Sequence, residues 1–233
     1  MLRFLPWLLL LLAVGARAEL PSRIEARYDL IGKGVKLGEV REVFVRQQDR
    51  YRVESVTRPV GLLALFQPET IVVTSEGEID ADGGLRPLRF THRRTRDSFR
   101  NSQADFDWSA GELTLNDQNG IRQVALTPGV QDRLSIMYQL VAQPPRAKLE
   151  LKFSMTNGSK LESYHYQIYP DQTVSVPFGT VKAHYLYTLP QKTAWKSEIW
   201  LATEHAYFPC KLVLTDDSGE KLTQALTHLT LTP

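Results

Sequence analysis

The strongest constraint on the fold of this 233-residue chain is an alternation of apolar and polar side chains with a period of two. Near the start of the pattern, Ile24, Ala26, Tyr28 and Leu30 alternate with charged side chains. Successive side chains of a β-strand point to opposite faces of a sheet, so the pattern predicts strands with one face on a core and the other in water. The expected strands are 24–30, 35–46, 51–57, 70–74, 88–95, 99–108, 112–115, 123–127, 148–153, 163–169, 181–188, 198–201, 211–215 and 221–231.

Residues that tolerate a positive φ angle lie between these segments, where hairpins need them. They occur at 82–84, 119–120, 157–158 and 217–219. Short strands joined by such turns predict an all-β fold, mainly an antiparallel sandwich or a half-barrel. Because no linker or internal repeat divides the chain, we expect residues 19–233 to form a single domain.

Two segments depart from the alternation. Residues 131–141 are predicted to form a helix with Asp132 as its N-cap, because apolar side chains recur there at helical spacing. The segment 60–66 is apolar without alternation, which favours a short helix or an apolar loop.

Together these two segments would roof an apolar cavity if both lay over a curved sheet. The alternative is that both fill the core of the domain. The candidate ligand-binding residues of the roof are Leu62, Leu63, Leu65, Phe66, Leu134, Met137, Tyr138 and Val141.

The first eighteen residues resemble a secretory signal peptide. Arg3 precedes an apolar run over 5–14, and Ala16 and Ala18 form a signal-peptidase site, so we predict cleavage after Ala18. The apolar run is shorter than the roughly 20 residues that a transmembrane helix needs. No cysteine follows the site to carry a lipid. We therefore expect an exported protein that is not an integral membrane protein after cleavage.

The overall charge gives no electrostatic case for binding nucleic acid or an anionic membrane. The chain has 28 Lys and Arg against 26 Asp and Glu, and loss of Arg3 and Arg17 with the signal peptide balances the two. One basic cluster remains between residues 89 and 100. We interpret it as a solvated sheet face that discourages edge pairing, although it would also suit phosphate, lipid headgroups or an acidic partner. Its members are Arg89, His92, Arg93, Arg94, Arg96 and Arg100.

No recognised catalytic, metal-binding or phosphate-binding motif occurs in the chain. Cys210 is the only cysteine, which excludes an intrachain disulfide, and it is expected to be a buried small apolar residue. His165 and His184 would form a metal site only if they met across a sheet with a third ligand such as Glu204 or Glu162. We therefore predict no catalytic residues, no metal and no cofactor.

Four stretches along the chain carry short motifs that occur in a fixed order. One is the hairpin 80–90 with its Leu-Arg-Pro, and a second is the Gln-Asp-Arg-Leu-Ser helix start at 131–138. A third is the Pro-Phe-Gly-Thr turn in 176–181. The last combines 198–201 with Tyr-Phe-Pro at 207–209 and the turn 216–219. In this order the four stretches resemble the bacterial family labelled domain of unknown function 3108. The resemblance implies an exported or envelope-associated β protein, and therefore a periplasmic one, without established activity or catalytic residues. Cys210 departs from the family, which usually has a β-branched residue there.

Three hypotheses for function follow from these observations. The first is a non-enzymatic periplasmic protein that binds a hydrophobic or amphipathic envelope ligand such as a lipid. The second is an interaction or scaffold protein of the cell envelope, with a filled core and a protein partner. The third is a hydrolase of envelope polymers, with His165, His184 and Glu204 as its weak candidates.

Overall fold

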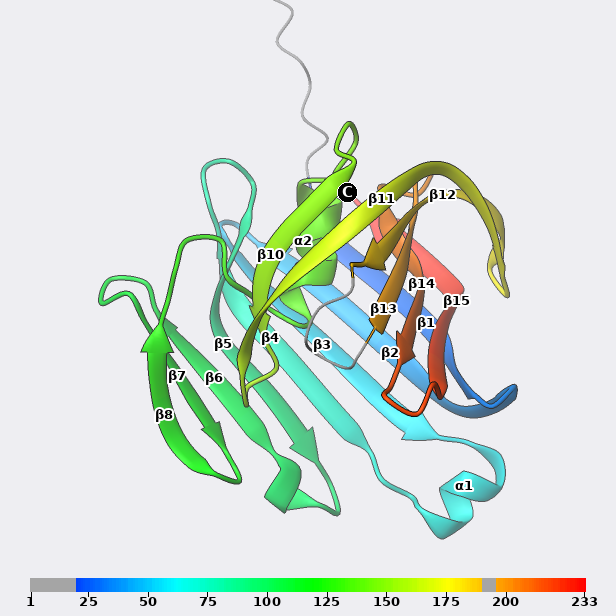
Figure 1. The fold of residues 1–233 in the computed structure, drawn as a ribbon, viewed down its shortest axis with the longest axis horizontal. Helices are drawn as coiled ribbons and strands as arrows, with labels where there is room; N and C mark the ends of the chain where they lie inside the picture. Colours follow the sequence, from blue (N-terminus) through cyan, green and yellow to red (C-terminus); the bar gives the residue numbers. More distant parts are fainter. Residues whose placement is uncertain (1–19, 190–195) are drawn as a thin grey trace, which may run out of the picture.

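The computed structural model describes residues 20–189 and 196–233, so the expected signal peptide lies outside the described residues. The described part contains fifteen strands, two α-helices and one 3-10 helix (Figure 1). The elements are β1 (Arg23–Gly32), β2 (Val35–Gln47), β3 (Arg50–Pro59), α1 (Gly61–Phe66), β4 (Ile71–Ile79), β5 (Leu85–Arg94), η1 (Ser98–Arg100), β6 (Ser102–Asp107), β7 (Glu112–Asp117), β8 (Gly120–Ala125), β9 (Gln131–Asp132), α2 (Ser135–Ala142), β10 (Glu150–Thr156), β11 (Leu161–Val176), β12 (Gly179–Thr188), β13 (Lys196–Ala202), β14 (Phe208–Thr215) and β15 (Lys221–Thr232).

All fifteen strands belong to one sheet, in the order β8-β7-β6-β5-β4-β3-β2-β1-β15-β14-β13-β12-β11-β10-β9. Every neighbouring pair is antiparallel except β9 and β10, which run parallel. The all-β prediction is confirmed, and the half-barrel alternative describes the result better than a sandwich. The physical reason is that β1 pairs with β15, which joins the two halves of the chain edge to edge rather than face to face.

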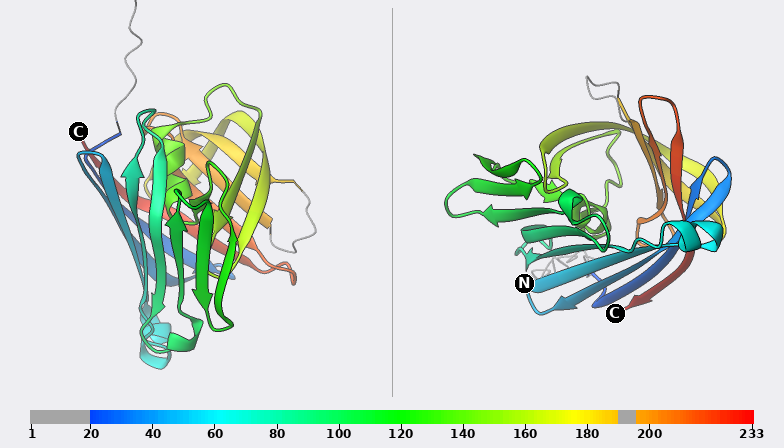
Figure 2. Two further views of the ribbon diagram at one scale, coloured as in Figure 1. Left: turned by 90° about the vertical axis from the view of Figure 1, so that its left-hand side faces the viewer. Right: turned by 90° about the horizontal axis from the view of Figure 1, so that it is seen from below.

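The sheet curls until its far end reaches β5 (Figure 2). At this closure the side-chain amide of Gln131 donates a hydrogen bond to the carbonyl oxygen of Leu85, at 2.7 Å. The turn between β10 and β11 also packs against β6, where the Ser102 hydroxyl donates to the carbonyl of Asn157 at 2.9 Å. Gly158 in this turn has a φ of +87°, and a Cβ there would lie 2.6 Å from the Ser102 oxygen. Only glycine suits both conditions.

The inner face of the curled sheet holds the larger of two hydrophobic clusters. Ile24, Phe44, Val53 and Phe90 are fully buried there, and their register places them side by side on neighbouring strands with few interruptions. Helix α2 lies inside the curve (Figure 1). Its Tyr138 stacks on Phe44, with the ring centroids 5.1 Å apart. The helix therefore fills one part of the barrel.

The helix predicted over 131–141 is shorter at its start than expected. Gln131 and Asp132 pair with β10 as strand β9, and α2 begins at Ser135. Pairing with a strand that is distant in the sequence overrides the local helical pattern here. The short helix predicted within 60–66 is present as α1.

Candidate functional site

The two segments expected to roof a cavity lie apart in the structure. Leu62, Leu65 and Phe66 of α1 are exposed, and no residue of α1 is buried. The helix sits where β3 passes into β4, at the end of the barrel remote from α2 (Figure 1). The expected roof made from both segments is therefore wrong, because α1 covers no part of the inner face.

The stripe on α2 faces the core, as its spacing indicates. Leu134, Tyr138 and Val141 are buried in the larger cluster, and Met137 is half-buried between both clusters. Leu63 of α1 is also half-buried. For the α2 stripe the structure favours the alternative that it fills the core.

The inner face of the curled sheet is accessible to solvent at the α1 end of the barrel, whereas the middle of the same face is buried. Inward-facing side chains on β1, β3, β4 and β5 are only half-buried there, although they share their face with the fully buried Phe44 and Phe90. We call this region the open half. Its described side chains are Leu30, Thr57, Ile71, His92 and Arg94.

Arg133 adds a positive charge to the open half. It lies between β9 and α2, and its amide donates to the carbonyl of Thr156 at 2.9 Å. Its side chain is accessible to solvent. Protein surrounds the guanidinium closely enough that burial lowers its pKa from the usual value, against the opposing charges of Asp132 and Glu42. Arg133 is therefore accessible to solvent and lies close to the charges of Asp132, Arg94 and Glu42.

Burial, modified by nearby charges and hydrogen bonds, shifts the pKa of two further side chains. Burial, together with the charges of Arg133 and Arg94, lowers the pKa of His92 to about 4, so its imidazole is neutral at pH 7. Burial raises the pKa of Glu42, although hydrogen bonds from Ser55 and Tyr138 oppose the increase. Arg94 is paired with Glu69 at 2.7 Å. At neutral pH the open half therefore presents Arg133 beside a neutral imidazole.

Asp132 fixes the backbone that carries Arg133. Its carboxylate accepts hydrogen bonds from the hydroxyl of Ser75 at 2.6 Å and from the amides of Leu134 and Ser135 at 2.9 and 2.7 Å. The last two bonds satisfy amides just before and at the start of α2. The N-cap position is Leu134, so the prediction of Asp132 as the N-cap is wrong. Burial raises the pKa of Asp132 to about 6. The sequence pair Asp132-Arg133 thus places one side chain in the core and the next in the open half.

The three weak hydrolase candidates have separate partners. His165 lies 2.9 Å from Glu150, and Glu204 lies 3.7 Å from Lys182. His184 is buried and packs edge-on against the ring of Tyr207. Residues 20–189 and 196–233 contain no group of three or more His, Cys, Asp or Glu side chains placed to hold a metal ion.

An aromatic row crosses the outer face of β11 to β14. Tyr185 lies between Tyr169 and Trp200, with ring centroids 5.8 and 4.7 Å away, and Lys211 covers the far side of Trp200 at 4.8 Å. These residues are directly opposite one another in the strand register. The ring faces are therefore largely covered by one another, an arrangement that stabilises neighbouring strands rather than presenting a flat platform. Cys210 precedes Lys211 on β14 and is buried, as predicted.

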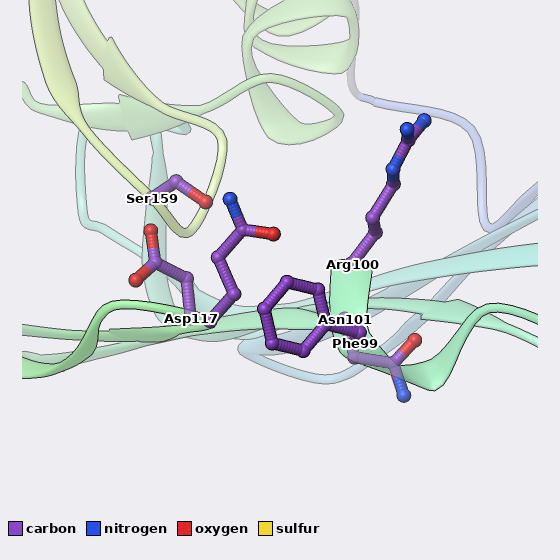
Figure 3. A pocket seen from close by; sticks show the side chains of 6 residues that line it. Phe99, Arg100, Asn101, Asp117 and Ser159 are labelled. Carbon is purple, nitrogen blue, oxygen red and sulfur yellow. The ribbon is translucent and has the colours of Figure 1, made fainter.

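A small pocket lies where η1, the β7–β8 turn and the β10–β11 turn meet. Its volume is about 180 Å³, and the labelled side chains in Figure 3 surround it. Asp117 is paired with Arg122 at 3.2 Å, and this partner lowers the pKa of Asp117 to about 2. Because its one lining carboxylate is already neutralised by an ion pair, the pocket offers no unpartnered acid for catalysis.

The sequence interpretation missed the site in the open half. It treated the basic cluster at 89–100 as one solvated face, whereas His92 and Arg94 share the inner face with Phe90 and only part of the cluster points outward. The period-two pattern contains this signal, because His92 and Arg94 follow Phe90 at steps of two. Arg133 carries no such signal, since its direction depends on the β9–α2 junction.

Comparison with known proteins identifies the family. No curated protein matches the chain significantly. A family model described as "Protein of unknown function (DUF3108)" matches residues 24–227. The chain belongs to the DUF3108 family. This confirms the resemblance carried by the four sequence stretches.

A solved structure shares the fold of this DUF3108 chain. It is the crystal structure of a beta-barrel-like protein of domain of unknown function DUF1849 from Brucella abortus. Sequence identity is 13%, the TM-score is 0.57, and the match covers 91% of this chain and 98% of the other. At this identity the likeness shows the fold alone. Within the described residues, no helix has the length and apolar character required to cross a membrane.

Proposed function

We propose that this DUF3108 protein is an exported periplasmic protein that binds an amphipathic, anionic envelope ligand in the open half of its barrel. The observation that supports the proposal is the contrast along one inner face. The face is fully buried beside α2 and accessible toward α1, where Arg133 lies. Accessible apolar side chains beside one convergent charge suit a small amphipathic molecule.

The side chains of the open half suit a ligand with two chemical parts. Leu30 and Ile71 offer apolar contacts to an acyl chain, while the Arg133 guanidinium offers paired donors to a carboxylate or phosphate. His92 is neutral, so it adds no charge beside Arg133. The buried stripe on α2 packs against protein and is not required to contact the ligand.

The test uses a fluorescent fatty acid as the probe, with the chain lacking residues 1–18. We expect the probe to bind, and Arg133→Gln to weaken binding about tenfold, because a charge-assisted hydrogen bond contributes roughly 1.5–3 kcal/mol. Arg27→Gln is the matched control, since Arg27 is exposed outside the open half. Extraction of the native protein followed by lipid mass spectrometry identifies any natural ligand.

A second readout locates the probe. An anion bound beside His92 stabilises its protonated form, so the pKa of His92 should rise from about 4 when the probe is present. NMR titration of the imidazole measures this shift. If the probe binds without moving the His92 resonance, or if Arg27→Gln weakens binding as much as Arg133→Gln, the proposed site is wrong.

The competing proposal is an envelope interaction protein with a filled core. The packing of α2 supports it, because Tyr138 contacts Phe44 and Phe208 in the middle of the barrel. It predicts that native protein carries no extractable amphiphile, that the fatty acid does not bind, and that crosslinking in cells captures a protein partner. A hydrolase remains the least supported proposal, since no observation brings its candidates together.

A further inference from the structure

The most exposed apolar side chains of the described residues gather at one end of the barrel. Phe66 is 79% exposed, Leu65 75%, Leu62 74%, and Phe99 and Ile121 70% each. Leu62, Leu65 and Phe66 belong to α1, and Phe99 to η1, at the same end as the connection between β5 and β6 (Figures 1 and 2). Ile121 follows the β7–β8 turn, whose Gln118 lines the small pocket together with Phe99. Exposed apolar patches of this kind mark interaction sites.

Hydrogen bonds join two segments of this end into one surface. The amide of Thr70 donates to the hydroxyl of Thr95 at 3.0 Å, and the amide of Thr95 donates to the carbonyl of Thr70 at 3.1 Å. These bonds tie 58–70, which includes α1, to 93–101, which includes η1. We call these two segments the tip.

The tip is strongly basic, whereas the chain beyond the expected signal peptide is balanced. It contains five arginines and two acidic residues. The acids are already occupied, because Glu69 pairs with Arg94 at 2.7 Å and Asp97 with Arg100 at 3.2 Å. The other three arginines are exposed and form no ion pair with any described residue. They are Arg58, Arg93 and Arg96.

We propose that the tip docks on an anionic lipid bilayer, with the apolar side chains of α1 and Phe99 at the headgroup boundary and the free arginines on the headgroups. The combination of exposed apolar side chains and arginines without ion pairs indicates a bilayer as the partner of the tip. Exposed apolar side chains at one end of the barrel suit the acyl boundary of a bilayer, and arginines beside them complement anionic headgroups. The proposal is independent of a ligand in the open half, because probe binding there is measured without vesicles.

The test is co-sedimentation with vesicles, using the chain lacking residues 1–18, which retains every described strand and helix. Vesicles of phosphatidylcholine with about one-third phosphatidylglycerol are compared with pure phosphatidylcholine, because lipid surface charge attracts basic segments. We expect at least about fivefold more bound protein on the anionic vesicles and loss of most of that binding at high salt, where surface charges are screened.

Two variants separate the apolar from the basic contribution. Leu62→Ser/Leu65→Ser/Phe66→Ser should reduce vesicle binding at least about fivefold, because less apolar surface enters the boundary. Its control is Leu149→Ser, an exposed leucine outside the tip. Unfolding curves identify any variant that has lost its fold.

The charge variant is Arg58→Gln/Arg93→Gln/Arg96→Gln. Its control, Arg27→Gln/Arg50→Gln/Arg146→Gln, removes the same charge from exposed arginines outside the tip. The tip variant should bind anionic vesicles at least about fivefold less, and the control should stay within about twofold of the parent protein. Equal binding to both vesicle types overturns the proposal, as does an equal loss in either control. Absence of vesicle binding combined with crosslinks at the tip in cells would assign the surface to a protein instead.

Discussion

Asp132 links the core, the start of α2 and the open half of this DUF3108 barrel. Its carboxylate is fully buried and accepts three hydrogen bonds, from Ser75, Leu134 and Ser135. Those bonds favour the ionised form, but the loss of hydration on burial outweighs them and raises its pKa to about 6. A group whose pKa is higher in the folded protein stabilises that protein most at low pH.

Asp132→Asn should remove one component of the pH dependence of folding. The pKa of Asp132 rises from 3.8 to about 6 on folding, so its contribution is fully present below about pH 4 and is lost as the pH rises through 6. At about 1.4 kcal/mol per pKa unit, the loss is about 3 kcal/mol by pH 7. Urea unfolding of both proteins between pH 4 and 7 measures it.

The comparison must be made as a difference between the two proteins. Glu42 and His92 also titrate, but both remain in the variant and their contributions largely cancel. Relative to the parent protein, Asp132→Asn should gain stability as the pH rises. Asp132→Ala should be less stable at every pH, because it leaves the amides of Leu134 and Ser135 unbonded. A constant difference between parent and Asn variant across the range would contradict the assignment.

At the scale of elements, the two helices have similar apolar sequences and opposite environments. Helix α2 buries Tyr138 against Phe44, with its hydroxyl donating to Glu42 at 3.2 Å. Helix α1 buries none of its residues. Apolar character alone therefore does not distinguish a core helix from an exposed one in this chain.

Replacing one large side chain in each helix by a small one should affect the stability of the protein very differently. Tyr138→Ala should lower the free energy of unfolding by about 3–5 kcal/mol, because it empties a large buried volume. Leu65→Ser should change the free energy by less than about 0.5 kcal/mol, as expected for an exposed site. Chemical unfolding monitored by circular dichroism measures both. A large loss from Leu65→Ser would mean that α1 packs on the barrel in solution, which would also weaken the docking proposal.

At the scale of the whole molecule, the sheet closes upon itself and leaves the strands at one edge outside the closure. Strand β9 contacts β5, so β6, β7 and β8 extend beyond the closure (Figure 2). Among the described strands, β8 pairs only with β7, whereas β1 is paired on both sides. The side chains of β8 are mostly exposed. Local stability should therefore fall from the centre of the sheet toward β8.

Hydrogen exchange should reveal this gradient. Amides of β8 should exchange at least about a hundredfold faster than those of β1, because opening an edge strand breaks one ladder and exposes little apolar surface. Mass spectrometry of peptides covering 118–126 and 24–31 compares the two directly. Equal protection would indicate that β8 is covered in solution, for example by a second copy of the chain.

Local rules predicted most of the strands and turns but fewer of the contacts around the site. Alternation identified the strand containing Phe90, and the Asn157–Gly158 turn lies where predicted. The start of α2 was wrong by four residues, because β9 forms only when β10 is alongside. His92 and Arg94 were assigned to a solvated face, because charge alone does not reveal which face of a strand becomes concave.

The sequence by itself determined the family, the period of the side chains and the turns. The period and the turns depend on neighbours within a few residues, so the local pattern suffices. Only the tertiary structure decided that one sheet curls into a barrel, that α2 enters it while α1 stays outside, and that Arg133 joins His92 in the open half. Each of these depends on pairing between distant strands, whose energy is shared among many contacts and is not encoded in any one segment.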